Sequence, residues 1–75
     1  MVKIDNIEKN DNLITMDCYE EGNPDRAHHV VFDADTLEIM NQTEKNIYIT
    51  QGIWRIYKIL KEKACLPRET CSYWY

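Results

Sequence analysis

The spacing of the apolar residues changes near residue 43, and this change constrains the fold more than any other feature of the sequence. Before residue 43, apolar residues recur at every second position, which is typical of strands with one buried face. After it, they recur at the spacing of an α-helix. The sequence therefore predicts an α+β protein in which a sheet is followed by a helix.

Short runs of alternating residues make up the first part of the chain. The residues on one face of these runs are Val2 and Ile4, then Ile14, Met16 and Cys18, then His28, Val30 and Phe32, and finally Leu37 and Ile39. Turn-forming clusters separate the runs at 9–12, 21–25 and 33–36. These turns set Cys18 opposite His28, Met16 opposite Val30 and Ile14 opposite Phe32, and then Phe32 opposite Leu37 and Val30 opposite Ile39. We therefore expect an antiparallel β-meander of three to four strands.

The helical segment has an apolar stripe formed by Ile49, Ile53, Ile56, Leu60 and Ala64, with Tyr57 beside it. Thr43 and Glu44 mark its expected start, and Pro67 ends it. Gly52 costs roughly 1 kcal/mol relative to alanine inside a helix. We expect it either to let a strand backbone approach closely or to show that the helix begins later. The helix on the sheet gives a βββ(β)α fold in a single domain, residues 1–75.

The aromatic residues at the C-terminus, in the sequence "SYWY", have no place in this sheet or helix. Trp54 also lies outside the apolar stripe of the helix. Burying a large side chain stabilises a fold by roughly 1.5–3 kcal/mol, so several exposed aromatics would be unfavourable. We therefore expect the aromatic C-terminal tail to fold back over Trp54, where Tyr73, Trp74 and Tyr75 would form a second cluster with it.

Charge is distributed unevenly along the chain, whose net charge is −4. Residues 1–43 contain three basic and ten acidic residues, whereas residues 44–63 contain five basic and two acidic ones. The negative total argues against non-specific nucleic-acid binding, which depends on cationic contacts to phosphate. Nucleic-acid binding stays open as an alternative through Arg55, Lys58 and Lys61, which surround Trp54 on the predicted helix.

The cysteines and histidines supply the candidate metal ligands Cys18, His28, Cys65 and Cys71. Zinc sites usually have paired ligands at short spacing, whereas this chain has a C-x5-C spacing and two adjacent histidines. Adjacent residues of a strand point to opposite faces, so His28 and His29 would not bind the same ion. We expect buried thiols and a half-buried histidine rather than a metal or cofactor site, with a Cys65–Cys71 disulfide kept open by a reducing environment.

The cysteine count and the N-terminus both indicate a cytoplasmic location. Three cysteines are an odd number with no typical disulfide pattern, and the sequence begins without the apolar segment of a secretory signal. No run of eighteen apolar residues is present, so we expect no membrane span. In the cytoplasm the "NQT" sequence at 41–43 would not be glycosylated.

No motif in the chain predicts catalysis. The segment "DADTLE" at 33–38 has some features of a calcium loop but lacks its third acid, its central glycine and its final glutamate, so a tight turn is favoured. The sequence contains no GxGxxG, GxSxG, HExxH or CxxC motif. Because 75 residues leave little room for a deep substrate pocket, we expect a protein that is not an enzyme.

Several apolar side chains face away from the helix on the predicted register. Such a group on one sheet face usually needs a covering partner. We therefore expect a protein–protein interaction domain with an accessory or regulatory role, which forms a homodimer through this face or a strand edge, or binds another protein. The predicted contacts are Ile7, Leu13, Val31, Met40, Trp54, Tyr73 and Trp74.

Overall fold

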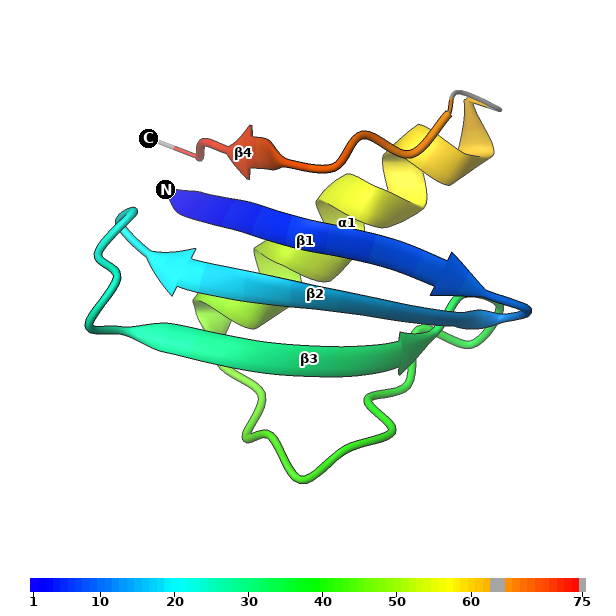
Figure 1. The fold of residues 1–75 in the computed structure, drawn as a ribbon, viewed down its shortest axis with the longest axis horizontal. Helices are drawn as coiled ribbons and strands as arrows, with labels where there is room; N and C mark the ends of the chain where they lie inside the picture. The colour runs from blue at the N-terminus through cyan, green and yellow to red at the C-terminus, as the bar shows by residue number, and fades with distance from the viewer. Residues whose placement is uncertain (63–64, 75) are drawn as a thin grey trace.

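The computed structural model describes residues 1–62 and 65–74. These residues form the strands β1 (Val2–Asn10), β2 (Leu13–Glu20), β3 (Ala27–Asp33) and β4 (Thr70–Ser72) and the helix α1 (Ile47–Lys61). The strands make one antiparallel sheet in the order β3-β2-β1-β4. The helix α1, between β3 and β4 in sequence, lies across one face of the sheet (Figure 1). The predicted α+β class is confirmed.

The β2–β3 hairpin has the predicted register. Ile14 pairs with Phe32, Met16 with Val30, and Cys18 with His28. The alternating apolar residues therefore lie on the face that α1 covers, and the packing of helix on sheet buries them. The core is formed by Val2, Ile4, Ile7, Ile14, Met16, Cys18, Val30, Phe32, Ile49, Ile53 and Ile56.

The expected fourth strand at residues 37–39 does not form. Ile39 makes an isolated bridge with Phe32, so the predicted pairs of Phe32 with Leu37 and of Val30 with Ile39 are wrong. The Asp33 carboxylate accepts hydrogen bonds from the N–H groups of Asp35 and Thr36, and Leu37 has a φ of 63°. Such a left-handed residue interrupts an extended strand, so the chain turns away here.

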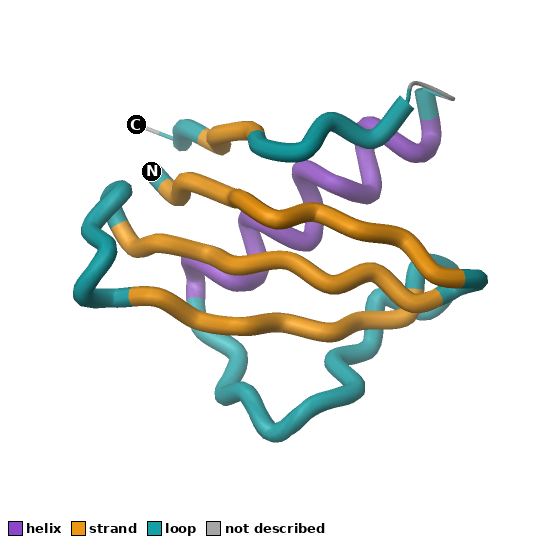
Figure 2. The backbone as a smooth tube through the Cα atoms, in the orientation of Figure 1, coloured by secondary structure: helices purple, strands orange, loops and turns teal. Residues whose placement is uncertain are grey.

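The loop after this turn runs along the outer edge of β3 (Figure 2). The Met40 N–H donates to the Val31 carbonyl over 2.7 Å, and the Val31 N–H donates to the Asn41 side chain over 3.2 Å. The Asn41 amide and the Thr43 hydroxyl both donate to the carbonyl of His29. The loop thus satisfies backbone groups that an edge strand would otherwise leave unpaired.

The C-terminal tail supplies β4, which pairs with the other edge of the sheet. Thr70 pairs with Ile4 and Ser72 with Val2, and the Ile7 N–H donates to the Arg68 carbonyl over 3.1 Å. The tail therefore folds back, as expected, and it runs beside β1 (Figure 1).

A bulge in β1 changes the direction of Ile7. The β1–β2 register shifts between Asp5 and Glu8, and Asn6 has a φ of 52°. The extra residue turns Ile7 toward the core, where it is 7% exposed. The prediction that Ile7 faces away from the helix is therefore wrong.

The helix α1 begins later than Thr43 and Glu44, because Asn46 is its N-cap. The Asn46 side chain accepts a hydrogen bond from the Ile49 N–H over 2.9 Å. Ile49, Gly52, Ile53 and Ile56 form the buried side of the helix. The expected roles of Ala64 and Tyr75 fall outside the described residues.

Gly52 allows the helix to approach the sheet, although the nearest atoms belong to side chains rather than to a strand backbone. A Cβ added at Gly52 would lie 3.2 Å from the Cys18 Sγ and 3.5 Å from the Met16 Cε. The glycine thus makes room for the Cys18 sulfur and the Met16 methyl group of β2. Within residues 1–62 and 65–74, no helix is both long and apolar enough to cross a membrane.

Candidate interaction surface

The structure does not bring the candidate metal ligands together. Cys18 and His28 are cross-strand partners on the side of the sheet that faces α1. Cys71 pairs with Lys3, between the inward-facing Ile4 and Val2, so it points to the opposite side of the sheet, and Cys65 is exposed in the loop after α1. In the described part of the chain, no group of three His, Cys, Asp or Glu residues is arranged to hold a metal ion.

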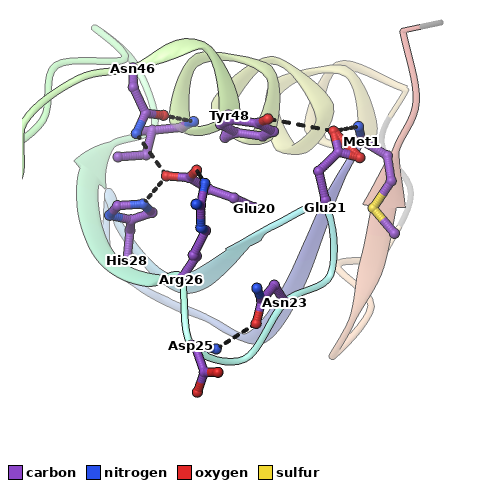
Figure 3. A network of polar contacts seen from close by, with 10 residues as sticks. Met1, Glu20, Glu21, Asn23, Asp25, Arg26, His28, Asn46 and Tyr48 are labelled. Carbon is purple, nitrogen blue, oxygen red and sulfur yellow. Dashed lines mark hydrogen bonds and ion pairs between the residues drawn. The ribbon is translucent and has the colours of Figure 1, made fainter.

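His28 belongs to a polar network that joins the sheet to the start of α1 (Figure 3). Its Nε2 lies 2.6 Å from the Glu20 Oε2, and the Asn46 amide donates to the same oxygen over 3.5 Å. The Arg26 guanidinium lies 3.6 Å from the other oxygen of Glu20. Because Asn46 also caps α1, this network positions the helix relative to the hairpin.

His29 belongs to a separate cluster on the sheet face that α1 does not cover. Its Nδ1 lies 2.8 Å from the Asp17 Oδ1, and the Asn6 amide donates to the Asp17 Oδ2 over 2.8 Å. Partial burial by itself raises the pKa of Asp17, but the hydrogen bonds to Asn6 and His29 and the charge of His29 outweigh it, so the pKa of Asp17 is lowered. This cluster stabilises a half-buried carboxylate beside the bulge at Asn6.

Cys18 is a buried thiol in the core. Burial, followed by the charge of Asp17, raises the pKa of Cys18 to about 12. The thiolate, which is the reactive form, is therefore scarce near neutral pH.

The predicted contact residues differ in exposure. Leu13 is 41% exposed and Met40 55% exposed, whereas Val31 is half-buried and its backbone is bonded to the loop beside it. Tyr73 is largely exposed, and a hydrogen bond to Cys71 raises its pKa.

The two tryptophans of the predicted cluster each pack on a tyrosine ring of α1. Trp74 packs edge-to-face on Tyr48 near the start of α1, with 5.6 Å between the ring centroids. Trp54 packs edge-to-face on Tyr57 at 5.4 Å and keeps 53% of its surface exposed. In the described part of the chain, the tail therefore leaves the outer side of α1 open.

Trp54 lies in the middle of a second stripe on α1, which we call the outward stripe. It consists of Thr50, Trp54, Tyr57, Lys58 and Lys61. Residues at these spacings are neighbours along one side of a helix. Trp54, Lys58 and Lys61 are exposed there, whereas Thr50 and Tyr57 are half-buried at its border with the core. The Lys61 Nζ lies 6.0 Å from the centroid of the Tyr57 ring, within the range of a cation–π contact.

A hollow lies on each side of Trp54. The hollow toward the end of the helix has a volume of about 640 Å³ and is lined by Trp54, Tyr57, Lys58, Lys61 and Glu62. The hollow toward the start has a volume of about 260 Å³ and is lined by Thr36, Leu37, Lys45, Thr50, Ile53 and Trp54. Trp54 lines both, so the two hollows adjoin at this residue, and we call them together the track.

Sequence reasoning had grouped Arg55 with Lys58 and Lys61. In the structure, the Arg55 Nε donates to the Thr70 hydroxyl over 3.4 Å, so the side chain is directed toward β4 and does not line either hollow. Tyr57, expected beside the apolar stripe, is half-buried, and its ring also lines the hollow toward the end of the helix. The i, i+3, i+4 and i+7 spacing of Trp54, Tyr57, Lys58 and Lys61 is the sequence signal that identifies this second stripe.

The chain matches none of the protein-family models, curated proteins or solved structures with which it was compared.

Proposed function

We propose that this domain is a non-catalytic protein-interaction module with an accessory or regulatory role, and that its contact surface is the outward stripe of α1. One observation supports this most strongly: Trp54 is 53% exposed between the two hollows, although the same chain has an aromatic tail that packs elsewhere. Tryptophan is enriched among the residues that contribute most to protein–protein binding, typically at the centre of the interface.

The scaffold behind the outward stripe suits such a role. The opposite side of α1 is fixed by Ile49, Ile53 and Ile56 in the core, and Asn46 caps its first turn. The outward side chains therefore project from a rigid helix at set spacing. A preordered surface binds with a smaller loss of conformational entropy than a flexible loop.

The polar clusters favour binding over catalysis. The His28–Glu20 pair faces α1 and the His29–Asp17 pair faces away from it, so they do not combine into one site. Cys18 is buried beneath Gly52 and is held as a neutral thiol. We place the protein in the cytoplasm, where free thiols such as Cys65 and Cys71 stay reduced.

A capture experiment with matched variants tests this proposal. Wild-type protein, Trp54→Ala and Met40→Ala are immobilised and exposed to lysate of the cells that express the protein, and bound proteins are quantified by mass spectrometry. Met40 is a suitable control because it is similarly exposed, at 55%, but lies outside the outward stripe. We expect a specific partner that binds wild type and Met40→Ala but is lost with Trp54→Ala, while all three melt at similar temperatures.

The same set of proteins distinguishes binding to another protein from self-association. If the partner is a second copy, sedimentation will show a mass above 9.0 kDa that rises with concentration and is lost with Trp54→Ala. A strict monomer that retains the same proteins with and without Trp54 contradicts the proposed surface.

A further inference from the structure

We propose that the partner presents a short acidic segment with an apolar anchor residue, and that this segment lies along the outward stripe of α1 across Trp54. This inference rests on the proposed function and adds the chemistry of the partner to it. Three features of the surface support it: its charge, the arrangement of its aromatic rings and its length.

Charge favours an acidic ligand at this surface. Lys45, Lys58 and Lys61 line the two hollows, and Glu62 is the only acidic residue among the residues that line them. In contrast, residues 1–43, which contain the three long strands, include ten acidic and only three basic residues. An acidic segment is therefore repelled by the sheet and attracted to α1, which directs it to one side of the molecule.

The aromatic rings favour an apolar side chain between the charges. The planes of Trp54 and Tyr57 are inclined at 88°, so the rings form a corner rather than a flat platform. A corner of this kind surrounds a leucine or phenylalanine side chain on two sides. Single-stranded nucleic acid, by contrast, binds by stacking successive bases on aromatic faces beside a cationic groove. The hydrogen bond from Arg55 to Thr70 also directs one cation away from the outward stripe, along which a nucleic-acid strand would lie.

The length of the track defines the length of the ligand. Thr50 and Lys61 are eleven residues apart on α1, which corresponds to about 16 Å at a rise of about 1.5 Å per residue. An extended peptide rises about 3.3 Å per residue, so about five residues span the track. With the anchor beside Trp54, acidic residues on both sides would reach Lys45 at one end and Lys61 at the other.

A nuclear magnetic resonance titration of the whole protein tests this inference directly. The probe is a capped hexapeptide with the sequence Asp-Glu-Leu-Leu-Asp-Glu, compared with one in which lysine replaces every acid and one in which serine replaces both leucines. We expect the acidic peptide to shift the indole N–H signal of Trp54 and the amide signals of Tyr57, Lys58 and Lys61. The Trp74 indole, which packs against Tyr48, serves as an internal control and should not shift.

Matched charge variants sharpen the test. Lys58→Gln with Lys61→Gln removes two charges from the outward stripe, whereas Lys3→Gln with Lys9→Gln removes two charges from the sheet. Because the first double variant removes two exposed ion pairs, we expect it to weaken peptide binding by up to about thirtyfold, and we expect the second to leave binding unchanged. Raising the salt to about 1 M, where the Debye length is about 3 Å, should weaken binding in the same way.

The outcomes separate this inference from the proposed function. Equal shifts with the lysine peptide, shifts confined to the sheet, or binding of only a short oligothymidine would overturn the acidic segment. A partner captured from lysate that is lost with Trp54→Ala but unaffected by Lys58→Gln with Lys61→Gln would support the proposed contact surface and overturn the acidic segment. Self-association that depends on Trp54, without peptide binding, also overturns the acidic segment.

Discussion

The two sides of α1 have similar spacing of large side chains but opposite environments. On the side that faces the sheet, Ile49 and Ile56 have no exposed surface, whereas on the opposite side Trp54 is 53% exposed. Hydrophobicity alone does not explain this difference, because an indole gains as much from burial as an isoleucine does. The explanation lies in what the rest of the chain covers.

The C-terminal tail decides which side of α1 stays open. Its backbone pairs with β1 through Thr70, Cys71 and Ser72, and Trp74 then reaches Tyr48 rather than Trp54. Pairing with β1 satisfies backbone groups that an uncovered edge would leave to solvent or to other chains. The hydrogen-bonding groups of the sheet edge thus direct the tail to β1, and Trp54 stays half-exposed.

The largest expected effect is the difference in lost stability between a substitution on the inward side of α1 and one on its outward side. Ile56→Ala removes a fully buried side chain from the core and should lower the free energy of unfolding by about 2–5 kcal/mol. Trp54→Ala removes a half-exposed ring and should change it by no more than about 1 kcal/mol. Urea denaturation followed by circular dichroism measures both. Equal losses would show that Trp54 is a structural residue, and that the two sides of α1 contribute equally to stability.

The second prediction concerns Cys18, which is buried beneath the inward side of α1. Burial raises the pKa of Cys18 from 9.0 to about 12, so the folded state keeps the thiol protonated where the unfolded state ionises. The unfolded chain then binds fewer protons, and stability falls as pH rises above about 9 until it levels off near 12. Each unit in this window should remove up to about 1.4 kcal/mol.

A variant without the thiol isolates this effect from other alkaline changes. The free energy of unfolding of wild type and of Cys18→Ala is measured by urea denaturation between about pH 8 and about pH 11. Both proteins contain the same tyrosines and lysines, so a difference between the slopes of their stability against pH is due to Cys18. We expect the wild type to lose stability more steeply. Parallel profiles of stability against pH would mean that water reaches Cys18 in the folded protein, and that burial does not raise its pKa.

The elements that were predicted correctly depend on local patterns. The alternation in β2 and β3 and the turn between them were enough to define the pairs Ile14–Phe32 and Cys18–His28. The periodicity of α1 identified Ile49, Ile53 and Ile56 as its buried residues. In each case one face is fully buried, and a shift by one residue would expose the entire apolar set, so the pattern carries the register.

The elements that were missed depend on distant parts of the chain. The bulge at Asn6 needs a left-handed residue whose side chain also donates a hydrogen bond to Asp17 on the neighbouring strand. The residues next to Ile7 contain no pattern that predicts it. The three-residue strand β4 forms only because the helix returns the chain beside β1. The exposed position of Trp54 follows from that pairing, so the candidate surface could be found only in part, as a basic helix face around one tryptophan.

The smallest expected effect tests how closely the inward side of α1 approaches the sheet. Gly52→Ala gains about 1 kcal/mol of helix propensity, but its Cβ would lie 3.2 Å from the Cys18 Sγ, so in the wild-type background the gain and the crowding should nearly cancel. In a Cys18→Ala background the sulfur is absent, and Gly52→Ala should stabilise the protein by about 1 kcal/mol. A double-mutant cycle by urea denaturation measures this coupling. Strictly additive effects would show that Gly52 is not required for the approach of helix to sheet, and the two sides of α1 would then differ in burial but not in the closeness of their packing.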